Sequence, residues 1–158
     1  MKHTILSLVC LTFLLICACS REETVNLEEL KETLRLSEFQ LDTEGLISLE
    51  TEKKRYASTT EEIFVEYTNL SEEPLITGHW SEVEILIDGE WYTIPLKPNV
   101  GGTDDVAFVV LPDRSLSMRT NLMSYDFSWP SGTYRVLRMV EKEHSKFHRI
   151  YAAEFTIQ

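Results

Sequence analysis

Apolar and polar residues alternate along several short segments of the chain. Apolar side chains take every second position in three of them, at 63–67, 83–87 and 151–157. A period of two residues is typical of a strand with one buried face and one solvent-facing face. The pattern therefore predicts β-strands that pack on a common core.

A hairpin is predicted where Asp88 and Gly89 separate two of the alternating segments. Asp-Gly in this position is a strong hairpin signal because both turn residues adopt positive φ. With these two residues as the turn, Ile85 faces Tyr92. A turn shifted by one residue, to Gly89-Glu90, keeps the same side chains on the core face.

Further segments read as strands, at 45–56, 106–111, 116–123 and 133–140. The run at 106–111 is continuously apolar, so we expect a strand that is buried on both faces. Seven to eight short strands with no helical pattern between them predict an all-β, antiparallel sandwich. A closed barrel has the same periodicity and stays open as the alternative.

The start of the chain has a different composition. Lys2 precedes an almost wholly apolar run at 5–18. This run of about fourteen residues is shorter than the roughly 20 that a membrane-spanning helix needs. A basic start, a short apolar core and a small residue at its end predict a secretory signal peptide at 1–18. A buried helix is disfavoured because the run has no polar stripe.

The residues Ile16-Cys17-Ala18-Cys19 resemble the lipobox of bacterial lipoproteins. The resemblance implies that the Cys19 thiol receives a diacylglycerol and that cleavage leaves Cys19 as the first residue. Two acyl chains give the stable anchoring that one fatty acid does not. We therefore expect a lipid-anchored protein on the extracytoplasmic face of the cell membrane. An ordinary signal peptide with a free thiol is the alternative.

The segment 19–44 connects the predicted lipidation site to the predicted strand domain at 45–158. Leucines recur at helical spacing at positions 27, 30 and 34, and Asn26 with Glu29 fits a capping box. We expect a short helix or a flexible spacer here, with the leucines docked on their own domain. A helix that binds a partner is less favoured.

Charge and cysteine content exclude several classes of function. The chain carries 15 basic and 26 acidic residues, which gives a formal net charge of −11. Nucleic-acid binding needs a basic surface, so we expect no nucleic-acid partner. Cys10 and Cys17 leave with the signal peptide and Cys19 carries lipid. The mature domain therefore offers no disulfide, no thiolate metal site and no thiol nucleophile.

Four short motifs occur in one order along the strand region. They are Asn69, Asp88-Gly89-Glu90-Trp91-Tyr92, Gly132-Thr133-Tyr134-Arg135 and Tyr151-Ala152-Ala153-Glu154-Phe155-Thr156-Ile157. In this order they resemble a family of bacterial immunoglobulin-like domains found in Firmicutes lipoproteins, over roughly 45–157. The resemblance implies an immunoglobulin-like fold and a surface location, and it carries over no catalytic residue. In such folds the tyrosine at the position of Tyr134 ties the chain back on itself through its hydroxyl.

Histidines and carboxylates could in principle hold a metal ion. His144 and His148 lie near Glu141 and Glu143, but His-x3-His suits a helix and this segment reads as a hairpin loop. A solvated charged loop is therefore favoured over a zinc site. The pair at 104–105 follows two glycines but lacks the spaced acidic positions of a calcium loop. We expect no metal and no cofactor.

Enzyme signatures are missing from the sequence. It contains no Gly-x-Ser-x-Gly motif and no glycine-rich phosphate loop. Trp80, Trp91 and Trp129 could form an exposed recognition patch, and Trp129 before Pro130 is the best candidate for exposure. Core packing of these rings is the alternative.

The sequence predicts a noncatalytic, membrane-anchored surface module with no catalytic residues. Its partners are expected to be the membrane, through the lipid, and another envelope protein, bound through sandwich loops or an edge strand. A surface lipoprotein that binds a small ligand or a metal, using His144 and His148, is the alternative.

Overall fold

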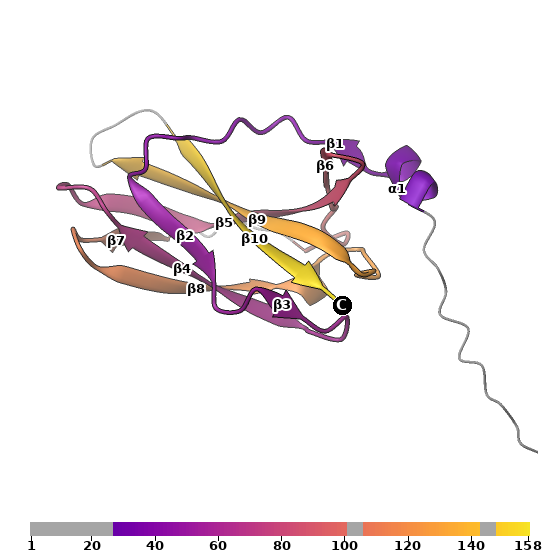
Figure 1. Ribbon diagram of the computed structural model, residues 1–158. Helices are drawn as coiled ribbons and strands as arrows, with labels where there is room; N and C mark the ends of the chain where they lie inside the picture. The colour runs from indigo at the N-terminus through magenta and orange to yellow at the C-terminus, as the bar shows by residue number, and fades with distance from the viewer. Residues whose placement is uncertain (1–26, 101–105, 143–147) are drawn as a thin grey trace, which may run out of the picture.

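The computed structural model describes residues 27–100, 106–142 and 148–158. Two β-sheets pack face to face, and the only α-helix in this part of the chain, α1 (Leu27–Thr33), lies at one end of them (Figure 1). None of the described helices has the length and apolarity needed to cross a membrane.

The larger sheet has seven strands, in the order β1-β6-β5-β9-β10-β3, and β7 pairs with the first half of β5. Its pairs are antiparallel except β3 with β10, which is parallel. The strands are β1 (Arg35–Leu36), β3 (Arg55–Tyr56), β5 (Leu75–Ile87), β6 (Glu90–Thr93), β7 (Ala107–Val110), β9 (Gly132–Lys142) and β10 (Arg149–Ile157).

The smaller sheet has three antiparallel strands in the order β2-β4-β8. These are β2 (Ile47–Thr51), β4 (Glu62–Asn69) and β8 (Ser115–Asn121), and a 3₁₀ turn at Leu122–Ser124 follows β8. The predicted all-β sandwich is confirmed. The described residues form ten strands, against the seven to eight expected, and the two-residue strands β1 and β3 account for the excess.

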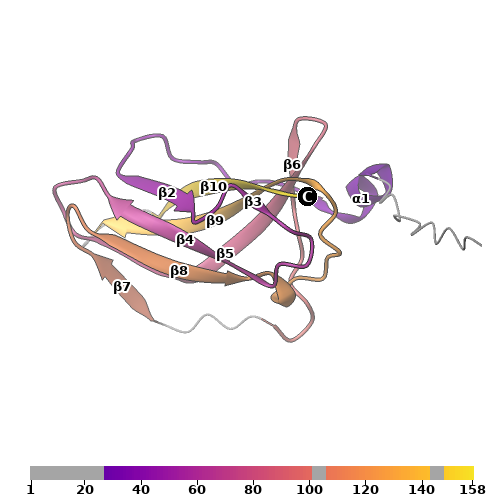
Figure 2. The same cartoon turned by 60° about the horizontal axis from the view of Figure 1, so that its bottom comes forward.

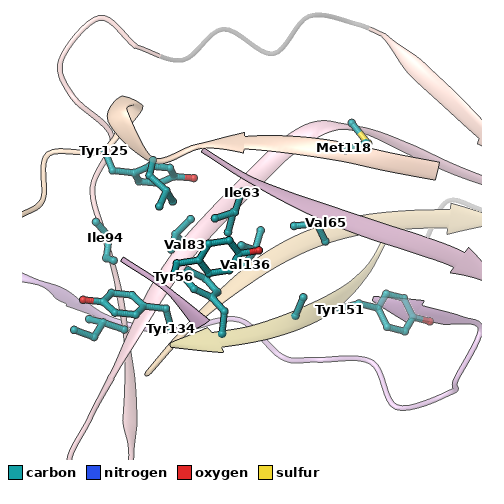
Figure 3. Packing of buried hydrophobic residues seen from close by; sticks show 14 of the residues in the cluster. Tyr56, Ile63, Val65, Val83, Ile94, Met118, Tyr125, Tyr134, Val136 and Tyr151 are labelled. Carbon is teal, nitrogen blue, oxygen red and sulfur yellow. The ribbon is translucent and has the colours of Figure 1, made fainter. Parts of the chain in front are cut away.

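The alternating segments bury the faces that their periodicity predicted. Ile63, Val65 and Tyr67 on β4 are almost fully buried between the sheets, as are the alternate apolar residues of β5 and β10. Figure 3 shows Ile63 and Val65 from the smaller sheet meeting Val83 and Val136 from the larger one. The core therefore combines residues from nearly the whole length of the domain.

The predicted hairpin is confirmed with its turn at Asp88-Gly89. Ile85 pairs with Tyr92, and the two turn residues have φ values of 49° and 86°. The backbone N–H of Ile94 also donates to the carbonyl of Val83 at 2.9 Å. The first register that the sequence offered is thus the one present.

The tyrosine predicted to tie the chain back on itself does so. The Tyr134 hydroxyl donates to the carbonyl oxygen of Pro130 at 2.5 Å, and the ring is fully buried. Burial raises the pKa of this hydroxyl well above its usual range. The bond closes the turn that leads into β9.

Two strand predictions are wrong in detail. The segment 45–56 is not one strand, because the chain turns after β2 and continues as β3, which joins the other sheet. The apolar run at 106–111 is not buried on both faces. It forms the edge strand β7, in which Val110 is buried while Val109 is 60% exposed, and Leu111 beyond it is 55% exposed.

The helix α1 and the residues that follow it pack onto the domain. Leu30 and Leu34 pack against the core, and β1 extends the larger sheet by pairing with β6. The chain then crosses the outer face of that sheet (Figure 1). There the N–H of Asp42 donates to the carbonyl of Ile150, and its carboxylate pairs with Arg149 at 2.8 Å.

Candidate functional site

A groove of about 780 Å³ lies along the side of the sandwich where the edge of the smaller sheet faces the larger one. One wall is β8, and the other comes from the middle of β5, from β7 and from the loop that follows β6. Figure 2 shows β7 and β8 meeting at one end of the sandwich. The apolar part of the lining consists of Trp80, Leu96, Val100, Phe108, Leu116, Met118 and Tyr125.

An irregularity in β5 shapes the groove wall that faces β8. β5 advances four residues between Thr77 and Ser81 while its partner β9 advances two, from Val140 to Arg138. The extra residues form a bulge, which bends a strand and releases backbone groups from the ladder. The bulge places His79 and Trp80 in the groove wall, where the His79 ring meets Phe108 edge-to-face at 5.0 Å.

The other wall is the edge of β8 that pairs with no strand among the described residues, its free edge. On β8's paired side, the N–H of Leu122 donates to the carbonyl of Glu61. Hydrogen-bonded and non-hydrogen-bonded positions alternate along an antiparallel pair. The backbone groups of Ser117 and Arg119 therefore point away from β4. Both residues line the groove.

Arg138 joins the two walls from inside the sandwich. Its side chain is only 1% exposed, and Nη2 donates to Thr120 Oγ1 at 2.6 Å and to the Arg119 carbonyl at 3.2 Å. Nη1 lies within 3.5 Å of the carbonyls of His79 and Trp80 at the bulge. The guanidinium thus satisfies acceptors on both walls.

The charge of Arg138 is not balanced by a carboxylate within the described part of the chain. Burial lowers the pKa of its guanidinium, but an arginine still keeps its proton at neutral pH. Within the same residues its Nε and the buried hydroxyl of Tyr67 have no hydrogen-bond partner. Arg138 is therefore a buried cation held mainly by carbonyl dipoles, directly beneath the groove.

One end of the groove is closed by contacts between two loops. Leu96 forms an isolated bridge with Tyr125, and the Tyr125 hydroxyl donates to the carbonyl of Ser81 at 3.3 Å. Burial raises the pKa of Tyr125 to about 12. The phenol therefore stays neutral over the physiological range and remains a hydrogen-bond donor.

A smaller cavity of about 310 Å³ adjoins the groove. Glu82 and Leu96 line both spaces, and the smaller one is bounded on its other side by residues 33–35. Burial raises the pKa of Glu82, although nearby Arg35 opposes this shift. The groove therefore extends towards the N-terminal segment of the domain.

The three tryptophans do not form one exposed patch, and the expected exposure of Trp129 is wrong. Trp129 is 6% exposed and packs against Tyr134, with ring centroids 5.5 Å apart. The ring centroid of Trp91 instead lies 4.2 Å from the guanidinium carbon of Arg135. Arg135 also forms a buried ion pair with Glu84, with Nε and Oε2 2.6 Å apart. Only Trp80 lines the groove.

The histidines are separated in the structure. His79 lies in the groove wall, whereas His148 pairs with Glu141 at 2.6 Å near the end of β9. His144, the acidic pair at 104–105 and the predicted lipidation site Cys19 lie outside the described residues. Within the ranges that the structure describes, no three His, Cys, Asp or Glu side chains are grouped to hold a metal ion.

The groove was not predicted from the sequence, although one signal pointed to it. In the strand 133–140, Tyr134, Val136 and Val140 share the core face, and Arg138 falls on that same face. A buried arginine is costly unless hydrogen-bond acceptors surround its guanidinium. The acceptors proved to be the carbonyls of the two groove walls.

The sequence and the fold were compared with known proteins to find the family of this chain. The sequence profile described as bacterial Ig-like domain matches residues 43–156. No curated protein matches the chain. Among solved structures it is similar to the Pseudomonas fluorescens alkylpurine DNA glycosylase AlkC bound to DNA containing an abasic site analog. That likeness has 12% identity and a TM-score of 0.36, and it covers 73% of this chain and 31% of that one.

The family match spans most of the chain and coincides with the sandwich described above. The hairpin at Asp88-Gly89 and the hydroxyl bond of Tyr134 both lie within the matched range. The protein therefore belongs to the bacterial Ig-like domain family.

Proposed function

We propose that the protein is a noncatalytic binding module, anchored by lipid on Cys19 at the extracytoplasmic face of the cell membrane. Anchoring is supported by the apolar run at 5–18 and by the lipobox-like residues that end at Cys19. A binding or structural role is supported by membership of the bacterial Ig-like domain family.

The observation that carries the binding role is the free edge of β8 facing an apolar groove. An extended peptide can add to such an edge, with backbone hydrogen bonds giving affinity and pockets for alternate side chains giving specificity. Ser117 and Arg119 supply the outward backbone groups, except that the Arg119 carbonyl is taken by Arg138. The aromatic wall opposite supplies the pockets.

The bound partner is an extended segment of another envelope protein. Its apolar side chains would pack between Phe108 and Met118, and its backbone would pair with Ser117. The net charge of −11 disfavours nucleic acid as the occupant. The bound segment would form a fourth strand of the smaller sheet.

The anchor is tested by the Cys19→Ala change in the full chain. We expect the unchanged protein to float with membranes and to yield an N-terminal peptide that carries acyl chains. The Cys19→Ala protein should lose both properties. Lipid anchoring would be contradicted if the Cys19→Ala protein still floated with membranes. A free Cys19 thiol in the mature protein would contradict it too.

The groove is tested by photo-crosslinking on intact cells. A photoreactive residue at position 117 should trap one envelope protein. The same residue at position 50 is the control, because Glu50 is exposed on β2 of the same sheet, away from the groove. Equal products from both positions would contradict a specific edge site. A groove that traps no protein but retains a small molecule would instead indicate small-ligand binding.

A further inference from the structure

The N-terminal segment is fixed to one end of the sandwich. Lys31 on α1 forms an ion pair with Asp88 at the tip of the β5–β6 hairpin. Leu36 on β1 pairs with Tyr92 on β6, which adds an edge to the larger sheet. The chain therefore enters the domain at the hairpin end, as Figure 1 shows.

The strand registers define the two ends of the sandwich. At the entry end lie the hairpin turn, the start of β9 and the end of β10, since Gly132 pairs with Ile157. The turn at 58–59 lies there too, because Tyr56 pairs with that same Ile157. At the opposite end Leu75 pairs with Lys142, next to the turn at 71–73.

The stretch of chain between Cys19 and α1 is no longer than the domain itself. Leu27 lies eight positions after Cys19, and a fully extended chain of eight residue steps reaches at most about 29 Å. The nine residues of β10 span about 30 Å along the sandwich. The point of entry thus stays within about 29 Å of a lipid on Cys19.

Charge keeps the domain from lying flat on an anionic surface. The chain has a net charge of −11, and α1 begins with Glu28 and Glu29. Anionic headgroups attract basic segments and repel acidic ones. Attachment at one end and this repulsion both favour a domain that stands away from the membrane surface.

We propose that the hairpin end faces the bilayer and that the turn at 71–73 points away from it, with the strands running outward. The proposal rests on the lipid anchor at Cys19. A segment added along β8 would then run between the membrane and the distal end.

The test uses the full mature, lipidated chain in anionic vesicles that carry energy-transfer acceptors in their headgroups. The mature sequence has no cysteine beyond position 19, so Ser58→Cys and Glu72→Cys each give one labelling site. Both residues are exposed, on turns at opposite ends. Unchanged unfolding transitions of the two variants serve as the folding control.

We expect a dye at position 58 to transfer energy more efficiently than one at position 72, corresponding to a height difference approaching one strand length. Equal transfer, or stronger transfer from position 72, in protein that floats with the vesicles would overturn the orientation alone. Protein that carries no lipid and fails to float would overturn the anchor and the orientation together.

Discussion

The guanidinium of Arg138 on β9 bonds to the hydroxyl of Thr120 on β8 at 2.6 Å, which joins the two sheets at the groove. β9 lies inside the larger sheet, whereas β8 is the edge of the smaller one. The bond therefore sets the spacing between the wall that carries the β5 bulge and the edge proposed to receive a partner strand.

Arg138→Met is expected to lower the free energy of unfolding by about 2 kcal/mol, since it leaves buried acceptors on both walls unsatisfied. Loss of the desolvated charge offsets part of this cost. Urea denaturation measures the change. Arg119→Met is the control, because its exposed ion pair with Glu62 is worth about 0.5 kcal/mol or less. Equal effects of the two changes would contradict the role given to Arg138.

Tyr134→Phe is expected to destabilise the domain by about 1 kcal/mol, the typical net contribution of one hydrogen bond. The change removes the bond to the Pro130 carbonyl and leaves the buried ring in place. The denaturant midpoint reports the loss. Tyr92→Phe is the control, because among the described residues its hydroxyl bonds to the exposed Glu90 alone. An unchanged midpoint for Tyr134→Phe would contradict a stabilising role of the bond to the Pro130 carbonyl.

Glu82→Gln is expected to stabilise the domain more at pH 7 than at pH 4. Burial raises the pKa of the Glu82 carboxyl in the folded state. The folded state therefore binds this proton more tightly than the unfolded state, and stability falls as pH rises through the folded pKa. Glutamine removes that loss.

The measurement is the free energy of unfolding of both proteins across this pH range. Glu50→Gln, at an exposed position on β2, is the matched control. A benefit of Glu82→Gln that is independent of pH would contradict a raised carboxyl pKa.

Gly89→Ala is expected to cost about 1 kcal/mol, because Gly89 has a φ of 86° that a side chain disfavours. Thermal unfolding should show the lower midpoint. Gly132→Ala is the control, since a Cβ there meets its nearest atom at an ordinary 3.6 Å. A larger loss at Gly132 than at Gly89 would show that the hairpin turn does not limit stability.

The sequence predicted those parts of the fold that depend on local periodicity. Ile63, Val65 and Tyr67 alternate in the sequence and share the core face of β4. The hairpin followed from Asp88-Gly89 because the turn residues themselves fix the register. In both cases neighbours in the sequence decide the outcome.

Burial that depends on distant partners was not predictable in this way. The run at 106–111 is as apolar as a central strand, yet among the described strands β7 pairs with β5 alone, and Val109 is exposed. Trp129 lies in a loop and has a φ of 54°, yet its ring packs against the rings of Tyr134 and Phe127. Hydrophobicity along a segment does not say which neighbours will cover it.

The candidate site was the least predictable part. The groove combines the bulge at His79 and Trp80, Phe108 of β7 and residues 116–121 of β8, which the topology brings together. Neither a motif nor a periodicity links these segments. Only the position of Arg138 on the core face of its strand indicated that buried acceptors would surround it.

The strand-addition account is tested most directly by comparing Ser117→Pro with Ser117→Ala for capture of the envelope partner by the lipidated protein. Proline removes the outward N–H and is tolerated on an edge strand, whereas alanine keeps the N–H and removes only the hydroxyl. If a partner strand pairs along β8, Ser117→Pro abolishes capture, Ser117→Ala retains it, and both variants fold. Capture that survives Ser117→Pro at full strength would contradict backbone pairing along β8.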